Sequence, residues 1–268
     1  MMISFFISSL LFIVTLHSQA AIPQKWLFTG SSTVAPVAAE LSKAFEKKHP
    51  LLRIDVQTGG STKGAIDTLK SLNDMGMISR KPHSGTEQTL KTFLLAKDGI
   101  AMIVHQSNPL TNLSHQEVQK IYKRQITNWK ALGGPDAPII LVHKAEGHST
   151  LELFLKHFRL KRSEVKPHIV IGDNEQGIKT VAGNPHAIGY VSIGAALHNI
   201  SLKTPIKMLK LDGITPSLQN VQNGQYPLQR PLYFVYKKST PLIEEFLSFC
   251  RSHEAHQIIQ KFYFLPIH

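Results

Sequence analysis

Short apolar runs alternate with longer amphipathic runs along this 268-residue chain, and that alternation limits its possible folds more than any other feature. Residues 26–28 and 52–57 have the composition of strands, whereas residues 34–48 and 64–72 repeat apolar positions at helical spacing. This strand-helix-strand-helix order predicts an α/β fold with a mainly parallel sheet and helices on both faces. Ligands of such sheets bind beyond the carboxyl ends of the strands, so the turns that follow the strands are the candidate site.

Further apolar runs at residues 100–105, 139–142, 188–191 and 232–236 also predict strands. With 42% hydrophobic residues, the chain can bury one large core or two modest ones. The sequence has no Pro/Gly/Ser-rich linker that would divide it. If the chain forms two lobes, extended crossover segments must join them.

The first 20 residues differ in composition from the rest of the chain. They contain no Asp, Glu, Lys or Arg, and their apolar run has the length of a signal peptide. We predict cleavage after Ala20 and export of a soluble protein to the periplasm, with no integral membrane segment left. Because the segment lacks a basic start, an uncleaved anchor remains the alternative. It has no cysteine for lipid anchoring, and Cys250, the only cysteine, cannot form an intramolecular disulfide.

Charge and motif content narrow the function. Thirty Lys and Arg against eighteen Asp and Glu give a formal charge of +12, which favours an anionic partner. These basic residues are spread along the chain instead of forming blocks, which disfavours a nucleic acid. The fourteen histidines are scattered and predict neither a metal site nor a cofactor. The chain has no Gly-x-Ser-x-Gly elbow and no nucleotide-binding glycine motif, so we predict that it is not an enzyme.

Three predicted strand-to-helix turns carry the chemistry of anion binding. They read Thr-Gly-Ser-Ser-Thr at 29–33, Thr-Gly-Gly-Ser-Thr-Lys-Gly at 58–64 and His-Lys-Ala-Glu-Gly-His-Ser-Thr at 143–150. A helix N-terminus offers free N–H groups and partial positive charge, and hydroxyls add neutral donors. Any one of these turns could be an ordinary helix cap. Three of them could surround one ligand, with Lys63 or Lys144 supplying formal charge.

The first two of these turns and six other segments resemble, in the same order, the phosphate-binding proteins of bacterial ABC importers. The resemblance covers nearly all of the chain after the predicted signal peptide. The segments are Gly-Ser-Ser-Thr-Val-Ala-Pro at 30–36, Gly-Gly-Ser-Thr-Lys-Gly at 59–64, Asp-Met-Gly-Met-Ile-Ser-Arg at 74–80, Leu-Ala-Lys-Asp-Gly-Ile at 95–100, Ile-Thr-Asn-Trp-Lys-Ala-Leu-Gly-Gly at 126–134, Ala-Ile-Gly-Tyr-Val at 187–191, Tyr-Pro-Leu-Gln-Arg-Pro-Leu-Tyr at 226–233 and Phe-Tyr-Phe-Leu-Pro at 262–266.

The resemblance implies a two-lobed type II periplasmic-binding-protein fold with two hinge-crossing strands, at residues 100–105 and 226–236. A signal peptide at 1–20 would precede lobe 1, made of residues 21–102 plus 230–268, and lobe 2 would span residues 103–229. The implied function is capture of inorganic phosphate between the lobes and its delivery to an ABC importer permease.

The resemblance also implies which residues bind the anion. Asp74 corresponds to a buried carboxylate that accepts the proton of the ligand. The other residues that carry over are Ser32, Thr33 and the Val34 amide in the first turn, Ser61 and Thr62 in the second, and Lys144, Ser149 and Thr150 in the third.

The third turn departs from the family pattern, which usually has Arg where this chain has Lys144 and Ser where it has His148. A lysine can neutralise an oxyanion but cannot make the two parallel hydrogen bonds of a guanidinium. A binding or sensor module for another oxyanion, or for an acidic envelope polymer, therefore remains an alternative. His148 could be an exposed loop residue or an extra anion contact, and Asp74 could instead cap a turn or pair with Arg80.

Overall fold

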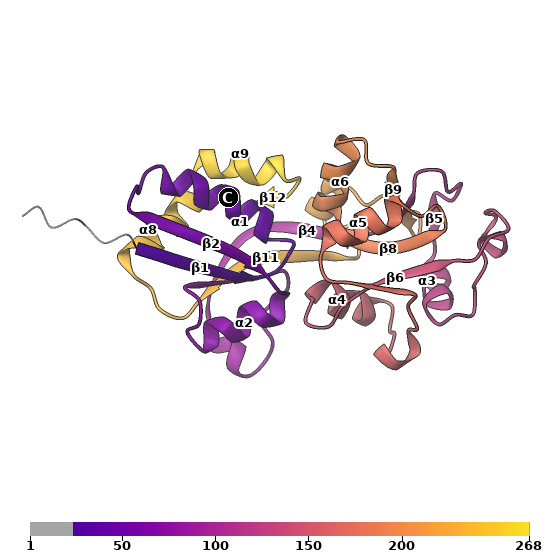
Figure 1. The fold of residues 1–268 in the computed structure, drawn as a ribbon, viewed down its shortest axis with the longest axis horizontal. Helices are drawn as coiled ribbons and strands as arrows, with labels where there is room; N and C mark the ends of the chain where they lie inside the picture. The colour runs from indigo at the N-terminus through magenta and orange to yellow at the C-terminus, as the bar shows by residue number, and fades with distance from the viewer. Residues whose placement is uncertain (1–23, 268) are drawn as a thin grey trace, which may run out of the picture.

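The computed structural model describes residues 24–267, so the predicted signal peptide lies outside the described residues. The described chain forms two bodies that lie side by side (Figure 1). Two long strands, β4 (Lys91–His105) and β11 (Gln229–Tyr236), run from one body into the other. They contain the two crossing segments that the family resemblance implied.

The first body is built on the parallel strands β1 (Gln24–Gly30), β2 (Leu52–Thr58) and β3 (Met75–Ile78). Its sheet has the order β2-β1-β3-β11-β4. The strands and helices predicted before residue 73 are confirmed, with ends shifted by a few residues. The helices of this body are α1 (Ala35–Glu46), α2 (Ser61–Leu69), α8 (Pro241–Cys250) and α9 (His253–Lys261), with a 3-10 turn at Thr86–Thr89.

The second body is built on β8 (Ala187–Ser192), β6 (Ile140–Lys144) and β7 (Ile169–Ile171), which are parallel to one another. Its helices are α3 (His115–Tyr122), α4 (Ser149–His157), α5 (Asn174–Ala182), α6 (Ile193–Ser201) and α7 (Leu218–Gln222). Shorter elements of this body are β5 (Asn112–Leu113), β9 (Ile206–Met208), β10 (Lys210–Leu211) and 3-10 turns at Trp129–Leu132 and Arg162–Glu164. The short strand β12 (Leu265–Pro266) instead pairs with β4 at Ala96 and Lys97.

The crossing strands make the sheet mixed. β11 runs antiparallel to β3 and β4, and β4 runs antiparallel to β8. The prediction of a mainly parallel sheet therefore holds for β1, β2 and β3 and for β6, β7 and β8, but the crossing strands add antiparallel pairs to the sheet of each body. A chain that enters a second body and returns must cross in both directions, which explains the antiparallel pair.

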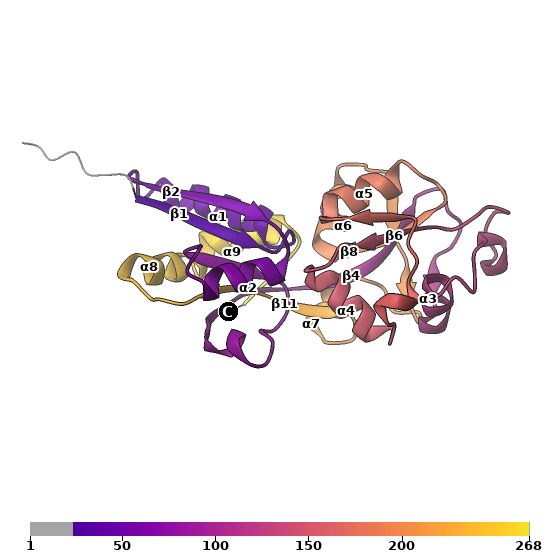
Figure 2. The same cartoon turned by 60° about the horizontal axis from the view of Figure 1, so that its bottom comes forward.

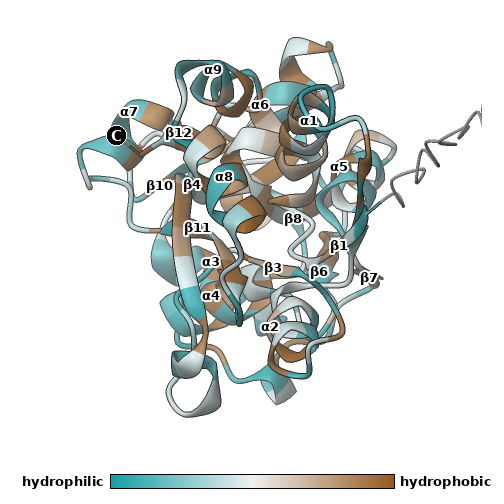
Figure 3. Ribbon diagram, turned by 90° about the vertical axis from the view of Figure 1, so that its left-hand side faces the viewer, coloured by the Kyte–Doolittle hydropathy of each residue, from teal (hydrophilic) through white to brown (hydrophobic). Residues whose placement is uncertain are grey.

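Four apolar clusters of the described residues stabilise the bodies, two in each. The largest cluster of the first body joins residues 26–96 with residues 232–264, and the largest cluster of the second body lies within residues 100–228. Figure 3 shows the apolar stretches of the strands on the inside and polar residues on the outer faces of several helices. The predicted lobe boundaries remain a prediction, and the packing of Ile100 and Met102 in the second cluster favours a first boundary a few residues before 102.

In residues 24–267, no helix combines the length and the apolar character that crossing a lipid bilayer requires.

Candidate functional site

Three helices begin at the carboxyl ends of strands and meet at a small cavity between the two bodies. α1 follows β1, α2 follows β2, and α4 follows β6. Figures 1 and 2 both show α2 of the first body beside α4 of the second. Nine residues line the cavity, and seven of them carry a hydroxyl: Ser31, Ser32, Thr33, Ser61, Ser79, Ser149 and Thr150, with Gly60 and His148 completing the lining.

The N-termini of these three helices lack a side-chain cap. Among the nine α-helices of residues 24–267, α1, α2 and α4 have no side-chain hydrogen bond at the N-cap. The other six have one. The uncapped first turns direct partial positive charge at the cavity, although the Val34 and Ala35 amides at the start of α1 already donate to Ser31 O. This is the arrangement that favours an anion.

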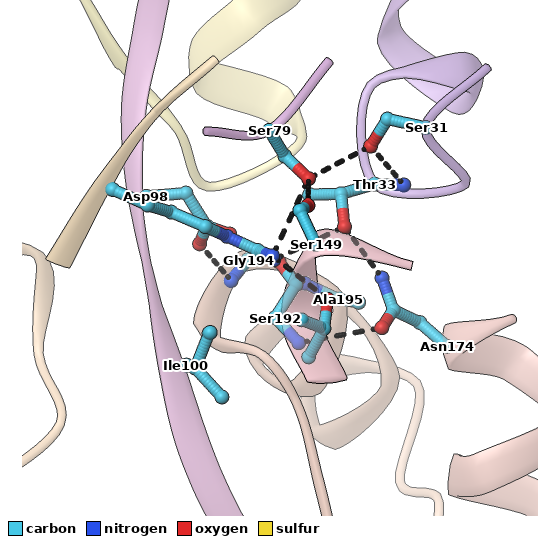
Figure 4. A network of polar contacts seen from close by, with 12 residues as sticks. Ser31, Thr33, Ser79, Asp98, Ile100, Ser149, Asn174, Ser192, Gly194 and Ala195 are labelled. Atoms are coloured by element: carbon cyan, nitrogen blue, oxygen red, sulfur yellow. Dashed lines mark hydrogen bonds and ion pairs between the residues drawn. The ribbon is translucent and has the colours of Figure 1, made fainter. Parts of the chain in front are cut away.

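Four serine hydroxyls connect the bodies inside the site. Ser79 follows β3, and its Oγ lies 3.0 Å from Ser31 Oγ and 2.5 Å from Ser149 Oγ. Ser61 Oγ lies 3.0 Å from Ser149 Oγ. Figure 4 shows Ser31, Ser79 and Ser149 pointing toward one another. Because Ser149 belongs to the second body and the other three belong to the first, these hydroxyls meet across the interface.

Arg230 supplies a fixed positive charge behind the hydroxyls. Its side chain is fully buried at the start of β11, where Nε and Nη2 donate to Asp98 Oδ2 at 3.1 Å and 2.9 Å. Nη1 donates to Thr150 Oγ1 at 2.8 Å, and Nη2 donates to Thr33 Oγ1 at 3.0 Å. The guanidinium therefore contacts hydroxyls from both bodies while Asp98 fixes its orientation.

Lys144, at the end of β6, is a second buried cation. Its side chain is almost fully buried, and its Nζ has no hydrogen-bond partner in residues 24–267. Burial lowers the pKa of Lys144 to about 7, with Asp173 opposing the shift and Arg230 adding to it. A buried ammonium without a partner is costly, and an anion nearby would offset that cost.

Five predicted residues line the cavity together, namely Ser32, Thr33, Ser61, Ser149 and Thr150. Two other predicted contacts are already used within the protein. The Val34 amide donates to Ser31 O at 3.1 Å. Thr62 is directed to the second body, since its amide donates to Gly147 O at 3.1 Å and its Oγ1 donates to Glu152 Oε1 at 3.2 Å.

The structure does not bring Asp74 to the cavity, although the resemblance implied that it contacts the ligand. Asp74 precedes β3, and its Oδ2 accepts a hydrogen bond from the Leu27 amide at 2.8 Å. Ser79 follows the same strand, so the two residues are about 16 Å apart at an extended rise. The physical reason is that Asp74 lies at the amino end of β3, whereas the cavity lies at the carboxyl ends. Its alternative partner, Arg80, pairs with Glu87 and Glu152 instead.

His148 is the N-cap residue of α4 and lines the cavity. It is half-buried, and burial together with Lys144 lowers its pKa below the ordinary histidine value. The imidazole is therefore neutral at pH 7 and adds no positive charge there.

Sequence reasoning missed several residues of the site, although four of them lie in the segments that carried the resemblance. Arg230 and Asp98 interrupt the apolar strands β11 and β4, and a buried charge in such a strand is the signal that could have identified them. Ser31 is adjacent to Ser32, which was predicted, and Ser79 lies in the segment 74–80 that carried the resemblance. Asn174, whose Nδ2 donates to Thr33 Oγ1 at 3.1 Å, carried no signal in the sequence.

A larger cleft of about 350 Å³ borders the small cavity at Ser32 and Thr33. Its walls include Pro36, Leu202 and Phe262, which offer no donors to an anion. The donors converge on the small cavity instead. In residues 24–267, no group of three His, Cys, Asp or Glu side chains could hold a metal ion.

Two α/β bodies, joined by crossing strands and enclosing a donor-lined cavity, define the class of two-lobed solute-binding proteins. The comparison of sequence patterns agrees, because the pattern of the PBP superfamily domain matches residues 17–254. The chain belongs to this superfamily, and the predicted type II periplasmic-binding-protein fold is confirmed.

Relatives within the superfamily confirm the resemblance to phosphate-binding proteins. The phosphate-binding protein PstS of Bacillus subtilis is 27% identical over 86% of this chain and 76% of its own length. A structure described as a phosphate ABC transporter substrate-binding protein of Clostridium perfringens with bound phosphate has a TM-score of 0.83. It is 31% identical and covers 91% of this chain and 100% of that one. An ABC-type phosphate transport receptor from Vibrio cholerae is 30% identical with a TM-score of 0.74, over 90% and 100% of the two chains.

Proposed function

We propose that this chain captures inorganic phosphate between its two bodies and delivers it to the permease of an ABC importer. The observation that carries the proposal is the meeting of hydroxyls from both bodies at the uncapped starts of α1, α2 and α4. The relatives named above as phosphate-binding proteins support the choice of anion.

The chemistry of the cavity fits a small tetrahedral oxyanion. Hydroxyls and helix N-terminal amides donate hydrogen bonds, and Arg230 and Lys144 supply positive charge in a region of low water content. An anion bound there would contact both bodies at once. Its binding free energy would then favour the arrangement in which the bodies are close together.

The transport role sets the location and the partners. We propose that residues 1–20 direct export and are removed, and that the remaining chain acts in the periplasm. There it would bind phosphate, release it to the permease and catalyse no reaction, because the superfamily to which it belongs is one of binding domains.

Calorimetric titration of the exported protein with inorganic phosphate tests the proposal. We expect saturable binding of one phosphate per chain, and we expect Ser149→Ala to weaken it because one hydroxyl donor is lost. Ser201→Ala, at an exposed position of α6, is the matched control and should bind as the wild type does. Absence of phosphate binding to the folded wild-type protein would contradict the proposed function.

A further inference from the structure

The proposed phosphate cavity has no carboxylate in its lining. Seven of its nine residues present hydroxyls, and the other two are Gly60 and His148. Asp98 lies behind them, but its Oδ2 accepts two hydrogen bonds from Arg230 and its Oδ1 accepts one from the Gly194 amide at 3.2 Å. Asp74 is at the far end of β3.

A carboxylate in the lining would tell phosphate from sulfate by the proton that phosphate keeps near neutral pH. It could accept a hydrogen bond from that proton, whereas a fully deprotonated anion would face like charge with no donor between them. A lining without a carboxylate lacks this means of distinguishing phosphate from sulfate. The ligand is then selected by its size and its charge.

Hydroxyls adapt to either ligand. Each one carries a single donor and two acceptor lone pairs, and its hydrogen rotates to suit the partner. Ser79 Oγ illustrates this freedom, because it has both Ser31 Oγ and Ser149 Oγ within hydrogen-bond distance. Such a group can accept the proton of hydrogen phosphate or donate to a bare oxygen of sulfate.

The two buried cations also make no distinction between the two dianions. Arg230 reaches Thr33 and Thr150 with N–H donors only, and Lys144 has an ammonium without a hydrogen-bond partner among the described residues. Both favour negative charge whatever the protonation state of the ligand.

From this geometry we infer that the site binds fully deprotonated tetrahedral dianions of the size of phosphate, with sulfate as the simplest member, alongside phosphate itself. The inference rests on the proposed function, since it concerns the same cavity. On this inference, the chain selects its ligand by size and charge.

Calorimetry of the wild-type protein at pH 7 with phosphate and with sulfate, at constant ionic strength, tests the inference. We expect the sulfate dissociation constant to lie within about tenfold of that for phosphate, because no like-charge contact penalises sulfate. Phosphate binding with sulfate more than about a hundredfold weaker would overturn the inference and leave the proposed function standing. Failure to bind either anion would overturn both.

Three variants locate the cause of the phosphate-to-sulfate affinity ratio. Ser61→Asp puts a carboxylate into the lining and should weaken sulfate more than phosphate, whereas Ser61→Ala removes one donor and should weaken both by a similar factor. Asp74→Asn should leave the phosphate-to-sulfate ratio unchanged. A changed ratio in Asp74→Asn, or an unchanged ratio in folded Ser61→Asp, would contradict the account of selectivity.

Discussion

Arg80 of the first body and Glu152 of the second form an ion pair across the interface, with Arg80 Nε 3.0 Å from Glu152 Oε2. Arg80 is held in place by Glu87, to which it donates two hydrogen bonds at 2.7 Å and 3.0 Å. Glu152 also accepts from Thr62 Oγ1 and lies 3.3 Å from His83 Nε2. None of these five residues lines the small cavity, so the contacts act on the arrangement of the bodies without touching an anion there.

The Glu152 contacts predict a change in affinity without a change in selectivity. Glu152→Gln removes the charge that faces Arg80 and should lower the affinity for phosphate and for sulfate by the same factor, about three- to tenfold, because closure becomes less favourable. Calorimetry with both anions measures the factor. The control variant Glu245→Gln, changed at an exposed position of α8, should bind both anions as the wild type does. A loss confined to one anion would show that Glu152 contacts the ligand.

A side chain at position 60 should block closure of the two bodies. Gly60 adopts φ +88°, and a Cβ at this position would lie 2.4 Å from Gly147 O of the second body. Gly60→Ala should therefore lower phosphate affinity by tenfold or more, since about 1.4 kcal/mol lost from the closed form is tenfold. Gly85→Ala is a close control, because Gly85 has φ +87° and open space around it. If both variants lose affinity equally, backbone strain and not the contact with Gly147 is responsible.

The Arg230–Asp98 pair predicts different effects on stability and binding. Arg230→Met leaves Asp98 buried without its partner and should cost about 3–5 kcal/mol of unfolding free energy. The double variant with Asp98→Asn should recover most of that stability but not phosphate binding. Chemical denaturation and calorimetry measure the two effects. Recovery of binding in the double variant would show that Arg230 acts only through folding.

The pKa of Lys144 predicts how the affinity for phosphate depends on pH. Burial places the pKa of Lys144 at about 7, and a bound anion favours its protonated form. The benefit of Lys144 to binding should be full below pH 7 and decline as the pH rises above it. Phosphate itself gains charge over this range, so the quantity to measure is the ratio of affinities of wild type and Lys144→Met. A ratio that stays constant between about pH 6 and about pH 9 would contradict this role.

Lys144 also affects stability, with the opposite trend. Its pKa is lowered from 10.5 in the unfolded chain to about 7 in the folded protein. Between these values the unfolded state binds more protons, so the contribution of Lys144 makes the protein more stable as the pH rises. In the absence of anions, Lys144→Met should be more stable than the wild type at pH 7, by a few kcal/mol at most, and this difference should shrink toward pH 10. Denaturation at both pH values measures it.

Much of the fold followed from local sequence patterns. The apolar alternation predicted β1, β2, β6 and β8 and the helices that follow β1, β2 and β6, because burial of one face dictates the period of the pattern. The antiparallel direction of β4 against β11 depends on contacts between residues more than 130 positions apart. No local pattern contains that information.

The site was predicted only in part, again because local sequence patterns do not contain the contacts between distant segments. Ser61, Ser149 and Thr150 lie in turns whose composition indicates donors, and a turn at a strand end fixes their place. Asp74 was assigned to the site because a motif position was transferred without knowing at which end of its strand it lies. Arg230 was missed because its partners come from four separate segments of the chain, at Thr33, Ser79, Asp98 and Thr150.

A crystal structure of the protein grown with inorganic phosphate tests the central claim most directly. The account predicts a single phosphate in the small cavity, with oxygens within hydrogen-bond distance of Ser61 and Ser79 from the first body and of Ser149 and Thr150 from the second. Arg230 would lie behind it and Asp74 would make no contact with it. A phosphate that contacts only one body, or that binds outside this cavity, would contradict the account.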